Sequence, residues 1–417
     1  MERFTTLRGF RDVYGEEIGR FRLIEGTART YFDLLGYKEI EIPVLEKTEL
    51  FKRSIGDTTD IVEKEMFTFI DRSNDSVTLR PEATAGLVRA YLQGSFYAKE
   101  RTSRLFSIGP MFRHERPQKG RFRQFYQVDA EVFGSPGPMV DAEIVWMIAL
   151  IAGDLGVEHY AMEVNSVGCK GCREGFRKAL VAFLEDRKSG LCEDCLGRLD
   201  RNPLRIFDCK VEQCGRIIGE APVLFDYLCP DCRSHFDEFQ DHLGRLRVPV
   251  IVNKRLVRGL DYYTRTVFEA TSPDLGSQKA FAAGGRYDNL VEEMGGPSVP
   301  GIGFAIGMER LALLTKRQPE KKAPLYFLAA VGDTARKWLI PIFDAFVSAR
   351  MSLAYAEPAG SLKSQMKHAN SLGADYVLIL AGEEVARGVI LVRDMADGSQ
   401  RELPLVPADL PALVKSI

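Results

Sequence analysis

The chain has 417 residues, of which 45% are hydrophobic and 27% charged, and its 56 Lys and Arg against 58 Asp and Glu give a formal net charge of -2. This balance excludes a disordered chain, a collagen-like repeat and a polycation that coats nucleic acid nonspecifically, although it still allows a local basic patch. The length predicts two or three domains.

The N-terminus, Met1-Glu2-Arg3-Phe4, has no basic segment followed by an apolar run, so no signal peptide is expected. The most apolar run, near Ile144–Gly153, is shorter than the roughly 20 apolar residues that a transmembrane helix needs. The sequence therefore predicts a soluble, cytoplasmic protein without a membrane partner.

The first 150 residues alternate helical and strand patterns. Glu17–Leu35 has apolar residues at helical spacing and ends at Gly36, a typical C-cap. Strands are predicted at Tyr37–Pro43, Val77–Leu79, Leu105–Met111 and Gln127–Phe133. This spacing suits an antiparallel sheet.

A cysteine-bearing block at about 169–235 is expected to be mostly helical, and strand patterns return after it. The returning strands are predicted at Leu256–Tyr263, Thr266–Ala270 and Gly301–Ala305. The block therefore looks inserted between strands of one sheet.

The charged, proline-bearing segment Thr315–Pro324 is predicted to be a linker. Beyond it, strands and helices alternate, which indicates a small, mostly parallel α/β domain. The expected order is Leu325–Val331 strand, Thr334–Ala349 helix, Leu353–Glu357 strand, Ser361–Leu372 helix, then strands at Tyr376–Ala381, Val389–Val392 and Arg401–Leu405.

Neither of the common glycine-rich phosphate loops is present, so a bound nucleotide would need phosphate contacts from side chains, for which arginine is best suited. Phe112–Phe125 carries five Lys or Arg with one Glu, and Pro117 and Gly120 lie at its centre. It indicates a basic hairpin that binds polyphosphate or nucleic acid, with an aromatic ring to stack on a base. A solvated surface hairpin is the alternative.

Three further segments combine charged, aromatic and glycine residues. Leu256–Glu269 sets Arg258 among strand-forming residues, where isolated charges are costly to bury. Ala282–Asp288 has paired glycines beside a charged, aromatic tip, and Gly301–Leu311 is a glycine-spaced strand leading into a helix. Each segment alone is a weak signal.

Together, and in this order, the four segments resemble the second class II signature, the two histidine-specific motifs and the third class II signature of histidyl-tRNA synthetases. Thr78–Thr84 resembles the substrate loop of that family, and Tyr37–Pro43 its dimer-forming first signature. The resemblance extends from Arg8–Asp12 to the C-terminal region.

The resemblance implies an α+β fold, in which helices flank a class II antiparallel sheet. It also implies an inserted, mostly helical Cys-rich domain and a C-terminal α/β anticodon-binding domain. The boundaries expected are 1–165 and 251–318 for the two parts of the catalytic domain, 166–250 for the insertion and 325–417 for the anticodon-binding domain.

The implied reaction joins ATP and L-histidine into histidyl-adenylate and then transfers the histidyl group to the 3′ end of histidine tRNA. By resemblance, the catalytic residues are Arg258, which stands where related enzymes use a metal ion, and Arg113, which contacts the α-phosphate. Nucleotide contacts are implied for Arg113, Glu115, Arg121, Phe125 and Arg310. ATP would carry Mg²⁺.

The same resemblance implies residues that bind histidine. They are Glu82, Thr84 and Gln127 near the ammonium, Glu131, Tyr263 and Tyr287 near the imidazole, and Arg113, Arg258 and Tyr262 around them. Such a site would reject an analogue lacking a ring nitrogen, because its own polar groups would be left unpaired. A structural salt bridge at Glu131 and a core aromatic at Tyr263 are the alternatives.

Arg116 and Gln118 are the candidates for contacts with the tRNA acceptor end, and a homodimer is expected from the resemblance alone. The nearest rival function is the non-catalytic, synthetase-like regulatory subunit of ATP phosphoribosyltransferase. That paralogue usually lacks the C-terminal domain and the intact motifs present here. A nucleic-acid-binding protein without activity is a second rival.

All eight cysteines fall in four close pairs, Cys169/Cys172, Cys192/Cys195, Cys209/Cys214 and Cys229/Cys232. Such pairs are typical of tetrahedral thiolate sites, and eight thiols would fill two zinc sites. The spacing leaves open one site or two, and which pairs combine. An iron–sulfur cluster and a set of buried reduced thiols are alternatives.

Overall fold

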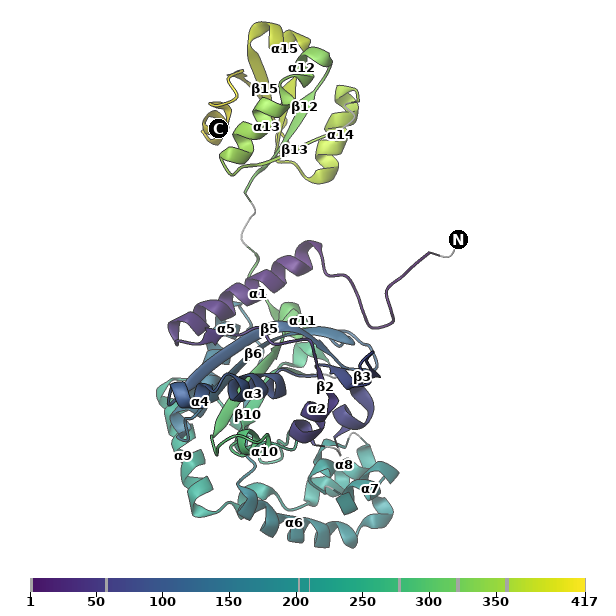
Figure 1. The fold of residues 1–417 in the computed structure, drawn as a ribbon, viewed down its shortest axis with the longest axis vertical. Helices are drawn as coiled ribbons and strands as arrows, with labels where there is room; N and C mark the ends of the chain where they lie inside the picture. The colour runs from purple at the N-terminus through teal and green to yellow at the C-terminus, as the bar shows by residue number, and fades with distance from the viewer. Residues whose placement is uncertain are drawn as a thin grey trace. The chain divides into compact units, whose positions relative to one another are not determined.

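The computed structural model describes residues 3–56, 59–201, 203–209, 211–276, 279–319, 323–356 and 360–416 (Figure 1). Two compact units divide the chain, Met1–Pro319 and Glu320–Ile417. No helix in these ranges is long and apolar enough to span a membrane.

An eight-stranded sheet forms the centre of the first unit. Its order is β1 (Lys38–Glu39), β5 (Ser103–Phe112), β6 (Gln124–Phe133), β11 (Gly301–Gly307), β10 (Ala280–Arg286), β9 (Thr264–Thr271), β7 (Ala161–Ser166) and β8 (Ile251–Val252). The inner strands are antiparallel, and only the two-residue strands β1 and β8 at the edges run parallel to their neighbours.

Helices cover one face of this sheet and bury its main core. They are α1 (Gly15–Leu34), α5 (Pro138–Asp154), α9 (Pro230–Arg245) and α11 (Met308–Leu314). Val128, Ala130 and Val132 of β6 point into this core. Because side chains alternate along a strand, Gln127, Asp129 and Glu131 point to the opposite face. The apolar alternation of β6 therefore places its polar residues in one row.

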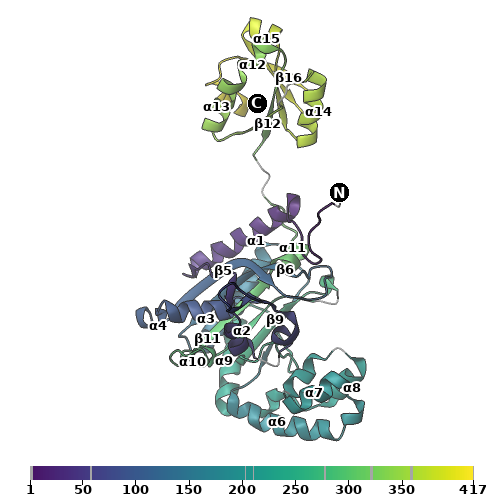
Figure 2. The same ribbon diagram turned by 45° about the vertical axis from the view of Figure 1, so that its right-hand side comes forward.

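Shorter elements lie over the opposite face (Figure 2). They are α2 (Thr48–Ile55), η1 (Ile61–Glu65), α3 (Thr84–Gln93), α4 (Phe96–Lys99), α10 (Leu290–Glu293) and a small sheet of β2 (Leu45–Lys47), β4 (Ser76–Leu79) and β3 (Phe67–Ile70). The short helix η5 (Pro273–Leu275) instead packs beside α11, with Leu275 against the main core. Tyr91 and Leu290 join Tyr263 and Tyr287 in a second core on this side.

The cysteine-bearing segment lies between β7 and β8 and is mostly helical, as predicted. It contains α6 (Lys170–Glu185), η2 (Lys188–Gly190), α7 (Glu193–Arg201), η3 (Pro203–Asp208), α8 (Glu212–Glu220), η4 (Leu224–Tyr227) and α9. Helices α6, α7 and α8 surround a small core of their own, with Phe176, Leu180, Cys195 and Cys214 buried in it. Helix α9 and Phe225 of η4 join the main core.

The second unit has a five-stranded sheet and five helices among the described residues. The sheet order is β13 (Ser352–Tyr355), β12 (Leu325–Ala330), β14 (Tyr376–Leu380), β15 (Val389–Asp394) and β16 (Gln400–Pro404), and the helices are α12 (Asp333–Arg336), α13 (Leu339–Ser348), α14 (Leu362–Leu372), α15 (Gly382–Arg387) and α16 (Leu410–Lys415). The sheet is mixed: β12 runs parallel to β13 and β14, as predicted, whereas β15 runs antiparallel to both its neighbours.

Other predicted elements differ in detail. The helix expected at 334–349 is broken into α12 and α13, and Pro341, which lacks an N–H donor, lies in the first turn of α13. Glu357, at the end of a predicted strand, and residues 320–322 of the predicted linker lie outside the described residues.

Two predicted strands are largely absent from the described chain. Only Lys38–Glu39 of the expected strand at 37–43 pairs with β5, because the carbonyls of Ile42 and Val44 instead accept hydrogen bonds from Arg80. No strand forms at 256–263, a described segment whose polar groups are bound by side chains and other loops. Asn165, for example, donates to the Leu256 carbonyl, which satisfies that group without a ladder.

Candidate active site and thiolate clusters

One cavity on the second face of the large sheet is lined by every residue that the sequence assigns to histidine or nucleotide binding. They are Glu82, Thr84, Arg113, Glu115, Arg121, Phe125, Gln127, Glu131, Arg258, Tyr262, Tyr263, Tyr287 and Arg310. These residues come from five segments that are far apart in the chain, so the antiparallel sheet is what brings them together.

Glycines of β11 make room for the polar side chains of its neighbours. A Cβ at Gly303 would overlap the carboxylate of Glu131, and one at Gly301 would overlap the ring of Tyr287. The glycine spacing that marks this strand in the sequence therefore has a steric cause. It leaves the floor of the cavity open beside Glu131.

Three buried carboxylates lie at one side of the cavity, on Glu82, Asp129 and Glu131. The Thr84 hydroxyl donates to Glu131 Oε1 at 2.6 Å, and the Tyr287 hydroxyl donates to Glu131 Oε2. Glu82 accepts from the backbone N–H groups of Thr84 and Ala85 at 2.9 and 2.8 Å. The carboxylates of Glu82 and Glu131 are thus held in fixed orientations.

Burial raises the pKa of all three carboxyl groups, that of Glu131 to about 8. Among the described residues, Asp129 Oδ2 and Gln127 Oε1 are buried with no hydrogen-bond partner. Buried acceptors of this kind need a donor, and an ammonium or an imidazole N–H would supply one. Asp129 was missed by the sequence analysis, although its position between Gln127 and Glu131 places it on the same face of β6.

The raised pKa of Glu131 predicts a pH-dependent stability of the ligand-free protein. An unfolded glutamate ionises near 4.5, whereas folded Glu131 keeps its proton up to about pH 8. Between these values only the folded state holds the proton, so stability falls as the pH rises through this window. We expect Glu131→Gln to have a flatter dependence of Tm on pH from 5.5 to 8.5, and parallel Tm curves for the two proteins would contradict this.

Arginines gather at the other side of the cavity. Arg113 Nε donates to the Pro81 carbonyl at 2.8 Å, and Arg310 donates to the carbonyls of Ala280 and Gly120 at 2.7 and 3.2 Å. Burial lowers the pKa of Arg113, Arg121 and Arg310, and neighbouring arginines lower the pKa of each further. Clustered cations of this kind suit a polyanion such as a triphosphate.

Ion pairs hold two of the basic residues of the cavity, Arg258 and Arg121. Arg258 donates to Glu269 Oε1 at 2.6 Å, and Arg121 pairs with Glu115. Phe125 lies beneath Arg113, with the guanidinium carbon 5.4 Å from the ring centroid. Glu269 lines the cavity but was not singled out in the sequence, since its pairing with Arg258 has no signature in the local pattern.

Arg116 and Gln118 do not line the cavity. Both are exposed in the loop that joins β5 to β6. The backbones of Gln118 and Arg121 bond to each other at 3.0 and 2.9 Å, and Gly120 has φ of +70° in the turn between them. The basic segment is therefore a hairpin with Arg113 and Arg121 at the cavity and Arg116 in solvent.

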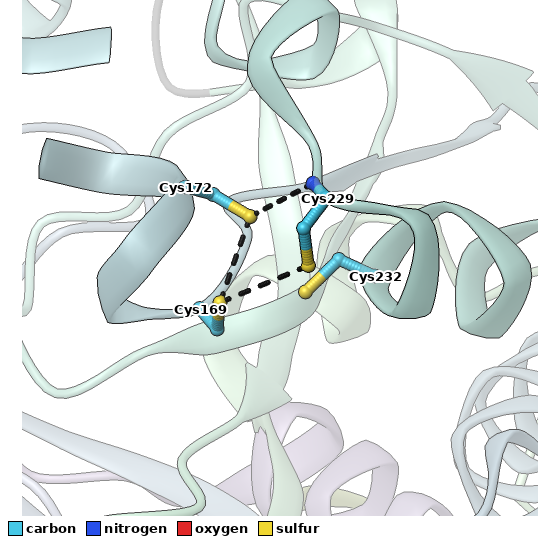
Figure 3. Close-up of side chains that lie close together, drawn as sticks. All are labelled: Cys169, Cys172, Cys229 and Cys232. Atoms are coloured by element: carbon cyan, nitrogen blue, oxygen red, sulfur yellow. Dashed lines mark hydrogen bonds between the residues drawn. The ribbon is translucent and has the colours of Figure 1, made fainter. Parts of the chain in front are cut away.

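The eight cysteines are all free thiols and form two separate groups of four. The first group is Cys169, Cys172, Cys229 and Cys232, and the second is Cys192, Cys195, Cys209 and Cys214. Figure 3 shows the first group converging from the starts of α6 and α9. The structure thus pairs the first close pair with the last, a combination that the sequence left open.

The spacing of the sulfur atoms fits a tetrahedral metal ion. The ligand atoms of each group lie within 4.8 Å of one another, with Sγ–Sγ distances of 3.6 and 4.0 Å in the first group and 3.8 Å in the second. Zn–S bonds of about 2.3 Å place tetrahedral thiolates roughly 3.8 Å apart. Neither group is part of the cavity lining, so a metal there would lie outside the reaction site.

Comparisons with known proteins agree with this site. A family model for histidyl-tRNA synthetase matches residues 9–311. A histidine–tRNA ligase of Desulfosudis oleivorans is 48% identical over 412 residues, which cover 97% of this chain and 96% of that protein. The corresponding ligase of Aquifex aeolicus is 47% identical over 400 residues, covering 96% and 98%.

Solved structures show the same relationship. The crystal structure of apo S. aureus histidyl-tRNA synthetase has 31% sequence identity and a TM-score of 0.81, and the match covers 99% of both chains. A Bacillus halodurans structure described as an ATP phosphoribosyltransferase regulatory subunit/histidyl-tRNA synthetase is 19% identical with a TM-score of 0.66, a likeness of fold alone. The chain belongs to the histidyl-tRNA synthetase family.

Proposed function

We propose that the chain is a histidine–tRNA ligase that forms histidyl-adenylate from ATP and L-histidine and transfers the histidyl group to histidine tRNA. One observation carries the proposal: a single cavity holds three buried carboxylates and a cluster of arginines. This combination suits an amino acid with a cationic ammonium on one side and a polyphosphate on the other. The full-length relatives named histidine–tRNA ligase favour it over a regulatory subunit.

The first step joins two anions. An oxygen of the histidine carboxylate attacks the α-phosphorus of ATP in line, and the bond from that phosphorus to the pyrophosphate oxygen breaks. Arg113 and Arg258 neutralise the charge that builds up on the α-phosphate and the carboxylate, and Arg121 and Arg310 bind the leaving pyrophosphate. ATP enters with Mg²⁺ on its phosphates, its adenine against Phe125 and its position set by Glu115.

Histidine is selected by the carboxylates. Glu82, Thr84 and Gln127 bind the ammonium, and the previously missed Asp129 adds to their negative charge. Glu131 binds an imidazole nitrogen, supported by the Tyr287 hydroxyl that already donates to it, with Tyr262 and Tyr263 forming the wall. In the second step a terminal ribose hydroxyl of the tRNA attacks the acyl carbon and displaces AMP.

The hairpin residues outside the cavity are proposed to bind the tRNA acceptor end. We expect Arg116→Ala and Gln118→Ala to lower the rate of histidine transfer to tRNA about tenfold each and to leave adenylate formation unchanged, because neither residue lines the cavity. Charging of histidine tRNA with labelled histidine, measured beside ATP–pyrophosphate exchange, checks this. Equal loss of both activities would place the hairpin in ATP binding instead.

We assign Zn²⁺ to the two thiolate groups as structural ions. Four sulfur donors at these spacings suit zinc, and a bound ion would stabilise a helical segment whose own core is small. An iron–sulfur cluster contains inorganic sulfide between its iron atoms, so its four cysteine sulfurs would lie farther apart than those of either thiolate group. The zinc ions have no part in the reaction steps.

The assembly and location follow the family. We propose a homodimer that uses the segment at 37–43, which includes the edge strand β1, and a second unit that binds the anticodon of the tRNA. A cytoplasmic location agrees with the absence of a membrane-spanning helix from the described chain.

A further inference from the structure

The segment that carries Arg258 is a loop with a cavity on each side. Residues 253–263, here called the Arg258 loop, form no strand among the described residues. Arg258, Leu260 and Tyr263 line the reaction cavity and also a second cavity, whose far wall includes Phe176 and Phe207 of the cysteine-bearing segment. The position of Arg258 therefore depends on what holds the loop from the far side.

Arg205 of η3 holds the loop from that side. Its Nη2 atom donates to the Gly259 carbonyl at 2.7 Å, and its Nε atom lies 3.2 Å from Asp261 Oδ1. These contacts fall one and three residues after Arg258. Arg205 is only 8% exposed, whereas the Asp261 side chain is 33% exposed, and the planar guanidinium directs both contacts.

Weaker contacts hold the other end of the loop. Arg255 donates to the carbonyls of Ile218 and Gly219 at the end of α8, and Lys254 Nζ lies 3.2 Å from Asp226. Both loop side chains are solvent-exposed. The exposed ion pair of Lys254 with Asp226 contributes little. Asn165 of β7 donates to the Leu256 carbonyl from the side of the sheet. Arg205 is thus the buried side chain that holds the loop from the side of the cysteine-bearing segment.

The second thiolate group surrounds the short helix that carries Arg205. Cys192 and Cys195 lie at the start of α7, and Cys209 directly follows η3. In addition, Arg198 of α7 donates to the Arg205 carbonyl at 3.2 Å. A six-residue 3-10 helix holds its shape poorly alone, because its hydrogen bonds have poor geometry. A metal ion bound by these thiols would join α7 to the end of η3.

We propose that Arg205 is a positioning residue for Arg258, and that zinc in the second thiolate group keeps it in place. This inference rests on the proposed ligase function and on the assignment of zinc. The Cys-rich insertion then contributes to catalysis through the Arg205 side chain. No cysteine of the first thiolate group, at the starts of α6 and α9, is in the elements that carry Arg205.

The first test replaces Arg205. We expect Arg205→Ala to lower kcat for histidine-dependent ATP–pyrophosphate exchange about 10- to 100-fold with small changes in the KM values, because a displaced Arg258 costs rate more than binding. Arg205→Lys should recover part of the loss. Arg216→Ala removes an exposed arginine of the same segment that does not touch the loop, and it should match the wild type.

The second test compares one ligand of each thiolate group by elemental analysis and exchange kinetics. Wild-type protein purified without chelators should contain two zinc ions per chain, and Cys209→Ser and Cys229→Ser should each lose one. Only Cys209→Ser should lower kcat, and adding Arg205→Ala to it should cause little further loss, because both act through one contact.

If the wild type is active, any of three results would overturn the inference. Arg205→Ala could have an unchanged kcat, or it could lose kcat only in proportion to a lowered Tm. The third such result is wild-type protein that contains no metal. An inactive wild type would instead contradict the ligase function.

Discussion

Replacement of Arg258 by alanine is expected to lower histidine-dependent ATP–pyrophosphate exchange about a thousandfold or more. The step joins a carboxylate to a phosphate, and removal of one charge-stabilising donor costs about 10²–10³-fold in comparable sites. Arg258 lines the cavity near Arg113. Burial and the positive charge of Arg258 both lower the pKa of Arg113. The loss should fall on kcat.

A structural role for Arg258 makes a different prediction. Its partner Glu269 would be left without this ion pair in the alanine variant, so some loss of stability is expected in either case. Glu269→Gln removes the same charge pair and keeps Arg258. A Tm lowered equally in both variants, with kcat reduced by a similar factor, would contradict the catalytic role.

Replacement of Glu131 by alanine is expected to lower kcat/KM for histidine about 10²- to 10³-fold, with little change in the KM for ATP. When a buried polar group of a binding site is removed, the groups that were hydrogen-bonded to it are left unpaired, and this costs much of the binding free energy. Here the partners are the hydroxyls of Thr84 and Tyr287. Steady-state exchange kinetics with each substrate varied in turn measures the effect.

Tyr287→Phe is the matched control for Glu131, because it removes one donor to the carboxylate and keeps the ring. Its effect on histidine should be smaller and in the same direction. If Glu131→Ala raised the KM for ATP and for histidine by the same factor, Glu131 would be a general structural residue of the cavity.

The residues proposed for histidine and nucleotide binding line one cavity, whereas the local structure of some segments that carry them differs from the prediction. Gln127 and Glu131 were assigned from the family resemblance, and the strand predicted at 127–133 places both on one face. The hairpin within Phe112–Phe125 followed from its charge and its turn residues. In contrast, the segment at 256–263 has the composition of a strand and forms a loop. Its polar groups bind Arg205 and Asn165, which are distant in the sequence.

Long-range pairing explains most of what could not be predicted. The combination of Cys169 and Cys172 with Cys229 and Cys232 depends on α6 and α9 starting side by side, which no local pattern encodes. The same holds for Glu269 beside Arg258, and for the antiparallel course of β15 in the second unit. The residue types thus indicated the kind of chemistry, whereas the contacts between distant residues depend on the fold.

Histidine-dependent ATP–pyrophosphate exchange by the purified full-length protein tests the central claim most directly. With Mg²⁺ and ATP present, labelled pyrophosphate should enter ATP when histidine is added and remain outside it when histidine is absent or replaced by another amino acid. Exchange that is absent with histidine, or equal with every amino acid, would contradict the account.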